Sequence, residues 1–137
     1  MKHFGKIIAF VFLLFNGSAA IYGGLNLIIY PDGSKIWLST DLLQNSVFEN
    51  FLLPGVMLFM IGLFSIYTMV AVIISFKKYW VLVMMQGTIL ALWLVIQLVI
   101  IRTITIPHLV MLIVAFLLIL TGNAMMPYKN EYKSDGL

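Results

Sequence analysis

Four apolar stretches, none of them interrupted by a charged residue, constrain this chain more than any other feature of its sequence. They cover about residues 7–29, 54–76, 79–101 and 107–126. A helix needs about 20 apolar residues to cross a hydrocarbon core about 30 Å thick, and it satisfies its own backbone hydrogen bonds in lipid. The sequence therefore predicts an all-α, membrane-embedded four-helix bundle that forms a single domain over residues 1–137.

The composition excludes several other classes of protein. Hydrophobic residues make up 63% of the chain and charged residues 9%, whereas soluble domains have roughly 25% charged residues. So few charges cannot cover the surface of a soluble fold or build the basic face that nucleic acid requires. The absence of cysteine excludes disulfides and Cys-ligated metal sites. We therefore expect no nucleic-acid partner, no metal and no cofactor.

The N-terminal segment has two interpretations. Its basic start, short apolar run and small residues near Ser18 to Ala20 resemble a secretory signal peptide. The apolar character resumes after these small residues, however, and continues to Ile29. We therefore expect a retained first helix that crosses the membrane.

The distribution of Lys and Arg predicts the orientation, because cytoplasmic loops carry an excess of both. If both termini are cytoplasmic, six of the eight basic residues fall on that side: Lys2, Lys6, Lys77, Lys78, Lys129 and Lys133. Lys35 and Arg102 then fall outside. The second and third connections are short, which makes consecutive helices antiparallel neighbours.

The longest polar segment, from Tyr30 to Gly55, carries its own local signals. The sequence PDGS at 31–34 is typical of a turn. Ser46 and Glu49 have the spacing of a capping box, and the leucines before them recur at helical intervals. We predict a turn and then an amphipathic cap over about residues 36–53 on the outer surface.

The four spans lack the ionisable side chains that many transporters and membrane enzymes need. Proton relays and general acid–base catalysis both require such groups, and no Asp, Glu, Lys or Arg lies in any span. This argues against a proton-coupled transporter acting alone and against an enzyme. An enzymatic site on the outer side would have to use Glu49, Arg102 and His108.

Neutral polar residues recur inside the first and third spans: Asn16, Tyr22, Asn26, Gln86, Trp93 and Gln97. They could form interhelical hydrogen bonds, each contributing about 0.6–2 kcal/mol. They could instead line a cavity for a lipid head group, a quinone or a small solute. On the second interpretation, the candidate ligand-binding residues are Asn26, Trp93, Gln97, Arg102 and His108. His108 could also be an ordinary polar residue in the first turn of its helix.

Small residues in the first helix predict close helix packing. Ala19 precedes Gly23 by four positions, and Ala20 precedes Gly24 by four. Such pairs allow two helix backbones to approach closely. The partner could be another helix of the bundle or a neighbouring protomer, and packing within the bundle is the simpler arrangement.

Several of these motifs occur together in a known group of proteins. The order Gly23-Gly24, PDGS, Leu42 to Phe48 and Pro54-Gly55, with the Trp93/Gln97 pair, resembles small uncharacterised four-helix bacterial integral membrane proteins. The resemblance implies the same architecture and a bacterial inner membrane. It carries no catalytic residue with it.

These observations predict a non-enzymatic inner-membrane protein with both termini cytoplasmic. It would be an accessory or structural subunit, or it would bind a lipid-like ligand beneath the outer cap. The alternative is a transporter or channel subunit for a small solute, acting as an oligomer. The expected partners are membrane lipids, other membrane subunits or further copies of the chain.

Overall fold

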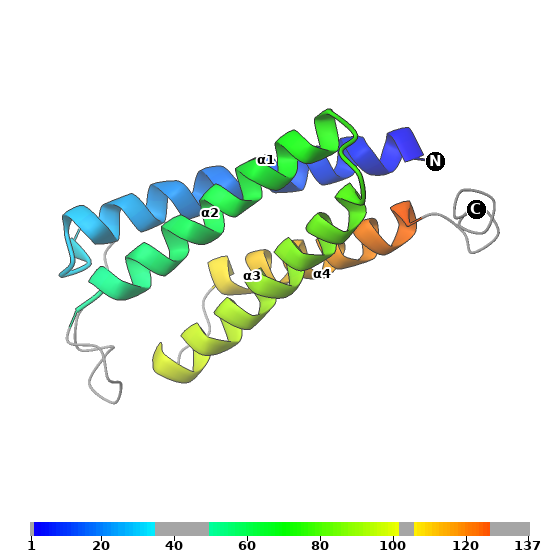
Figure 1. The fold of residues 1–137 in the computed structure, drawn as a ribbon. Coiled ribbons are helices and arrows are strands. Elements are labelled where there is room, and N and C mark those ends of the chain that lie inside the picture. Colours follow the sequence, from blue (N-terminus) through cyan, green and yellow to red (C-terminus); the bar gives the residue numbers. More distant parts are fainter. Residues whose placement is uncertain (1, 35–49, 102–105, 127–137) are drawn as a thin grey trace.

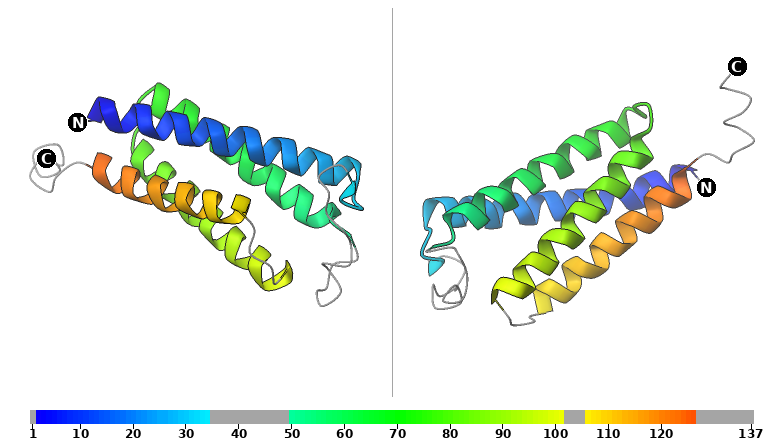
Figure 2. Two further views of the ribbon diagram at one scale, coloured as in Figure 1. Left: turned by 180° about the vertical axis from the view of Figure 1, so that it is seen from behind. Right: turned by 60° about the horizontal axis from the view of Figure 1, so that its bottom comes forward.

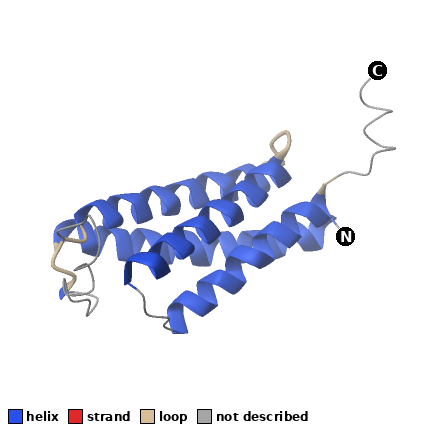
Figure 3. Cartoon of the chain, turned by 90° about the horizontal axis from the view of Figure 1, so that it is seen from below, coloured by secondary structure: helices blue, strands red, loops and turns tan. Residues whose placement is uncertain are grey.

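A computed structural model describes residues 2–34, 50–101 and 106–126 of the chain. Within these ranges the regular structure is entirely helical (Figure 3). The helices are α1 (Lys2–Ile29), α2 (Leu52–Ile73), α3 (Tyr79–Ile101) and α4 (Ile106–Met125). The chain is therefore an all-α protein. Most of the predicted outer cap, including Ser46 and Glu49, lies outside the described residues.

The helices form an antiparallel bundle of two hairpins, α1 with α2 and α3 with α4 (Figure 1). The start of α1, the turn between α2 and α3, and the end of α4 lie at one end of the bundle, here called the turn end. From this end α2 and α3 diverge toward the opposite end, where α3 ends and α4 begins (Figures 1 and 2). We call that opposite end the open end.

Close contact between backbones holds α1 against α2. A Cβ atom added to Gly24 would lie 2.6 Å from the backbone nitrogen of Phe59 and 2.9 Å from the carbonyl oxygen of Gly55. One added to Gly62 would lie 2.9 Å from the backbone nitrogen of Ile21. Real side chains do not approach this closely, so glycine permits the contact at each point. The first hairpin is a tightly fitted pair of helices.

The second hairpin uses the same device. A Cβ atom added to Gly87 would lie 2.7 Å from the carbonyl oxygen of Ala115, and one added to Gly122 would lie 2.9 Å from that of Trp80. Larger apolar side chains fill the space between the hairpins. Leu13, Val83, Leu90 and Leu118 are all at most 2% exposed.

The first connection begins with the turn that the PDGS sequence predicts. The Gly33 N–H donates to the carbonyl oxygen of Tyr30 at 3.0 Å, and Gly33 has a φ of 78°. The Phe51 N–H donates to the carbonyl oxygen of Pro31 at 2.8 Å, which ties the end of α1 to the start of α2. Pro54 lies in the first turn of α2, where its missing N–H breaks no helical hydrogen bond.

The second helix ends three residues before the end of the apolar segment, at Ile73 rather than at residue 76. Ser75 takes a left-handed conformation with a φ of 53°. Its N–H donates to the carbonyl oxygen of Val72, and the N–H of Phe76 donates to that of Ala71. This is the Schellman motif, which closes a helix while satisfying its last carbonyls. Hydropathy cannot reveal such a stop because the segment stays largely apolar as far as Phe76.

All four helices are long and apolar enough to cross a membrane. Many of their large apolar side chains point away from the bundle, for example Ile7, Val99 and Phe116, each more than 60% exposed. Contact with lipid rather than with water accounts for such a surface. On this evidence the chain is a multi-pass membrane protein.

Candidate functional site

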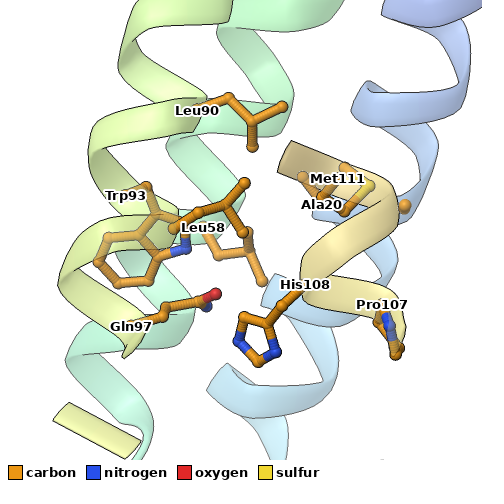
Figure 4. Close-up of a pocket in the computed structure, with 10 residues that line it drawn as sticks. Ala20, Leu58, Leu90, Trp93, Gln97, Pro107, His108 and Met111 are labelled. Atoms are coloured by element: carbon orange, nitrogen blue, oxygen red, sulfur yellow. The ribbon is translucent and has the colours of Figure 1, made fainter. Parts of the chain in front are cut away.

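A pocket of about 180 Å³ lies between the two hairpins, toward the open end (Figure 4). All four helices contribute residues to it, and the space exists because α3 diverges from α2 there. Its lining residues are Ala19, Ala20, Leu58, Leu90, Trp93, Leu94, Gln97, Pro107, His108 and Met111. None of the ten carries a carboxylate, an ammonium or a guanidinium group. The pocket is mainly apolar, with three polar side chains.

Trp93 and Gln97 reach the pocket from the same face of α3, because they are four residues apart. Trp93 is only 3% exposed, and its Nε1 is buried without a hydrogen-bond partner among the described residues. Figure 4 shows this nitrogen on the side of the ring that faces the pocket. A buried donor left unpaired costs about 1–3 kcal/mol. The indole N–H is therefore the group at the pocket that most clearly lacks a hydrogen-bond acceptor.

His108 enters the pocket from the first turn of α4, which begins at Ile106. Pro107 is well suited to this turn because its fixed φ suits a helix start. Figure 4 shows the imidazole of His108 directed toward the space that the amide of Gln97 also faces. The pocket thus places an indole donor, a carboxamide and an imidazole around one apolar space.

The structure brings together three of the five ligand-binding candidates: Trp93, Gln97 and His108. Asn26 does not line this pocket, because its Nδ2 donates to the carbonyl oxygen of Tyr22 in its own helix at 2.7 Å. Asparagine side chains often bond to nearby backbone in this way. Arg102 lies outside the described residues, as does Glu49, so the proposed outer catalytic cluster stays a prediction.

Some small residues of α1 lie at the helix interface, some line the pocket, and Ala20 does both. Ala20 and Gly24 face α2, where a Cβ on Gly62 would lie 3.1 Å from that of Ala20. Ala19 lines the pocket, and a Cβ on Gly23 would meet only the end of the Leu58 side chain, at 3.3 Å. The Ala20/Gly24 pair therefore packs within the bundle.

A second group of polar residues lies deeper in the bundle, between the pocket and the turn end. Asn16 Nδ2 donates to Ser65 Oγ at 3.3 Å, and Ser65 Oγ donates to the carbonyl oxygen of Leu13 at 2.8 Å. Gln86 Nε2 donates to the carbonyl oxygen of Ile61 at 3.3 Å. These bonds join α1 to α2 and α2 to α3. Asn16 and Gln86 thus make interhelical hydrogen bonds, one of the two interpretations open from the sequence.

The two amide oxygens in this group, Asn16 Oδ1 and Gln86 Oε1, are buried without a donor among the described residues. Their orientation follows from their neighbours. The Ser65 hydroxyl donates its proton to the carbonyl oxygen of Leu13, so it can only accept from Asn16. Asn16 must therefore present its nitrogen to Ser65. Gln86 must likewise present its nitrogen to a carbonyl oxygen. Both acceptors are therefore left facing the interior.

Sequence reasoning missed the apolar wall of the pocket, above all Leu58 and Met111. Both belong to continuous apolar runs, and no periodicity distinguishes a pocket wall from a surface that faces lipid. Among the described residues, no three or more His, Cys, Asp or Glu side chains gather as they would to hold a metal ion.

Comparisons with protein-family models, with curated proteins and with solved structures each found no match. The resemblance to small bacterial four-helix membrane proteins therefore stays a prediction from the sequence.

Proposed function

We propose that this chain is a non-enzymatic membrane protein that binds an uncharged, lipid-like molecule in the pocket between its hairpins. The observation that carries the proposal is the buried Trp93 Nε1, which has no acceptor among the described residues and faces the pocket. A ligand oxygen that reached this nitrogen would accept its hydrogen bond and remove the cost of leaving it unpaired.

The lining specifies the chemistry of this ligand. An indole N–H is a donor only, so the ligand must present an acceptor. None of the ten lining residues carries a carboxylate, an ammonium or a guanidinium group to balance a charge, and an unpaired charge in such surroundings is costly. A carbonyl group next to an apolar chain, as in an acyl ester, an amide or a quinone, meets both conditions. The amide of Gln97 offers a further donor or acceptor to the same group.

The size of the pocket sets how much of the ligand it encloses. Its volume of about 180 Å³ exceeds the roughly 30 Å³ that one water occupies in the liquid. A head group with part of a chain fits this space, and the rest of a long chain would extend into the surrounding lipid. Beneath the pocket, the fully buried Leu13, Val83 and Leu118 close the core. That packing favours binding over conduction through a single chain.

The orientation is part of the same proposal. We propose a bacterial inner membrane, with the turn end toward the cytoplasm because Lys6, Lys77 and Lys78 lie there. The pocket then opens near the outer surface, beneath the segment predicted as a cap. Such a protein would serve as an accessory subunit that carries or senses a lipid-like molecule for a larger membrane assembly.

The binding proposal is tested with Trp93→Phe, which keeps a ring and removes the N–H. The probes are a short-chain monoacylglycerol and a short-chain quinone, with an alkane of the same chain length as the comparison. Binding to purified protein in neutral detergent is measured by native mass spectrometry. Loss of one hydrogen bond should weaken binding of at least one carbonyl probe about fivefold, with little change for the alkane.

Trp80→Phe is the matched control, because Trp80 lies at the turn end, edge-on to Tyr79 and away from the pocket. It should bind both probes as the wild-type chain does. The proposal fails if neither carbonyl probe binds the wild-type chain in preference to the alkane, or if the two tryptophan variants lose affinity equally.

The orientation has its own test, which the absence of cysteine makes simple. Lys77→Cys and Asn50→Cys each introduce one exposed thiol, at opposite ends of the bundle. A membrane-impermeant maleimide added to intact cells, with the outer membrane permeabilised, should label position 50 and spare position 77. The reverse pattern would overturn the proposed orientation and leave the binding proposal standing.

A further inference from the structure

A second cavity, separate from the Trp93 pocket, lies between α1 and α2 at the turn end. It has a volume of about 290 Å³ and is lined by Lys6, Ile7, Phe10, Val72 and Ile73. Ile7 and Ile73 are 62% and 60% exposed, so the walls of this groove face the surroundings of the bundle. For a chain that spans a membrane, those surroundings are the acyl chains of lipids. Lys6 is the only cation among the groove's lining residues.

Lys6 is held in position rather than left free in solvent. Its Nζ donates to Ser75 Oγ at 2.6 Å and lies 5.0 Å from the centroid of the Tyr79 ring. The two contacts come from both sides of the turn that joins α2 to α3. An ammonium group has three donors, and Ser75 uses one of them. The other two are available to oxygen atoms of a ligand that enters the groove.

The conformation of Ser75 supports a role for its hydroxyl. It occupies the left-handed position of the Schellman motif, with a φ of 53°. Glycine is the usual residue there, because a side chain in this conformation is strained. Serine therefore adds strain to the turn, and its hydroxyl provides the acceptor that holds Lys6 in position. The backbone strain at Ser75 is explained if ligand binding depends on the position of Lys6.

The charge around the groove identifies its occupant. Lys77 and Lys78 are exposed on the same short turn as Ser75, so three ammonium groups gather at this end beside an apolar groove. A ligand that complements both features carries an anionic group at one end and a hydrocarbon chain at the other. Basic pockets between transmembrane helices on the cytoplasmic side bind anionic lipid head groups in this way.

We propose that this groove binds one anionic phospholipid. Its phosphate contacts Lys6, which Ser75 holds in position, and one acyl chain lies along Ile7, Phe10, Val72 and Ile73. Ser75 is a positioning residue, since it acts on the lipid through Lys6. The site is independent of the Trp93 pocket, which takes an uncharged head group and lies toward the opposite end of the bundle.

The first experiment compares phosphatidylglycerol with phosphatidylcholine of the same acyl chains, binding to the purified full chain in neutral detergent, by native mass spectrometry. The wild-type chain should bind phosphatidylglycerol more tightly. Each basic residue near a membrane surface contributes about 1 kcal/mol to anionic lipid binding, so Lys6→Gln should weaken phosphatidylglycerol about fivefold. Lys77→Gln removes the same charge from outside the groove and should have a clearly smaller effect.

Ser75→Gly separates positioning from folding. Glycine relieves the left-handed strain, so the unfolding temperature should stay the same or rise, while phosphatidylglycerol binding should fall because Lys6 is released. Ser75→Ala should weaken binding similarly without that gain in stability. A purely structural serine would give the opposite result, with binding unchanged in both variants.

Three outcomes would overturn the proposal. One is equal binding of phosphatidylglycerol and phosphatidylcholine by the wild-type chain. Another is an equal loss from Lys6→Gln and Lys77→Gln, which would indicate general attraction to the turn rather than a built site. Competition by soluble glycerol phosphate as strong as that by the lipid would also overturn it, because the groove would then contribute nothing.

Discussion

The interfaces within the hairpins differ in kind from the interface between them. Within a hairpin, glycines bring the backbones together, as Gly24 does against Phe59 and Gly87 against Ala115. Between the hairpins, large side chains fill the space, the amide oxygen of Gln86 lacks a donor among the described residues, and a pocket remains toward the open end. The close contacts hold the two helices of each hairpin together, and the less complete fit between the hairpins leaves the space in which we propose that a ligand binds.

The largest expected effect comes from breaking the contact within a hairpin. Gly24→Ala places a methyl group 2.6 Å from the backbone nitrogen of Phe59, and backbone cannot move aside as a side chain does. Overpacking of this kind costs about 1–3 kcal/mol. The measurement is unfolding of the purified chain in detergent by titration with a denaturing detergent, followed by helical circular dichroism.

Gly23→Ala provides the matched control in the same helix. Its methyl group would meet only the end of the Leu58 side chain at 3.3 Å, and alanine favours a helix over glycine by about 1 kcal/mol. This variant should unfold at the same denaturant concentration as the wild-type chain or at a higher one. Equal destabilisation by the two substitutions would contradict the close fit inferred for the first hairpin.

A smaller effect is expected from the hydrogen bonds that join α1 to α2. Ser65→Ala removes the link between Asn16 and the carbonyl oxygen of Leu13, and leaves the buried amide nitrogen of Asn16 without its partner. Interhelical bonds in membranes contribute about 0.6–2 kcal/mol, so we expect a loss of about 1 kcal/mol in the same unfolding assay. The reason is the loss of two bonds at one buried atom.

Thr68→Val is the control for this substitution. Thr68 is as buried as Ser65, but its hydroxyl donates to the carbonyl oxygen of Phe64 in its own helix at 2.9 Å. Removing that bond affects no contact between helices and should change the unfolding free energy by less than about 0.5 kcal/mol. If Thr68→Val proved as damaging as Ser65→Ala, burial rather than the interhelical bond would explain both.

The hydrogen bond from Gln86 to Ile61, which joins the two hairpins, should contribute less to stability than the Gly24 and Ser65 contacts. Gln86→Met loses one long hydrogen bond, to Ile61, but it also removes the buried oxygen that has no donor. The two effects oppose each other, and methionine fills a similar volume. We expect a change within about 0.5 kcal/mol of zero. A loss above about 2 kcal/mol would mean that the Gln86 oxygen is satisfied in the folded protein, for example by a buried water.

The same contrast explains which features could be predicted from the sequence. Four helices follow from four uncharged apolar runs, and Ala20 and Gly24 at a spacing of four predict a close helix contact. The left-handed Ser75 that ends α2 at Ile73 leaves no trace in hydropathy, so the sequence predicts that helix to continue to residue 76. The positions of Leu58 and Met111 in the pocket wall depend on the angle between the hairpins. Asn26 could have faced the pocket, and only its bond to Tyr22 shows otherwise.

The smallest effect concerns the turn that closes the first hairpin, and it appears only as a dependence on pH. The Ser34 backbone N–H donates to Asp32 Oδ1 at 3.0 Å, which lowers the pKa of this carboxyl below its ordinary value of 3.8. The folded state therefore releases the proton more readily than the unfolded state. The stabilisation is fully present above the unfolded pKa and is lost as the pH falls below 3.8 and through the lowered value.

Asp32→Asn should abolish that part of the pH dependence in unfolding curves between neutral and acidic pH, while Asp32→Glu, whose longer side chain fits the turn poorly, should reduce it. Because the carboxyl is fully exposed, salt should weaken the effect of pH on stability further. A steep, salt-resistant pH dependence that requires Asp32 would show that the turn contributes more to the stability of the hairpin than its single hydrogen bond indicates.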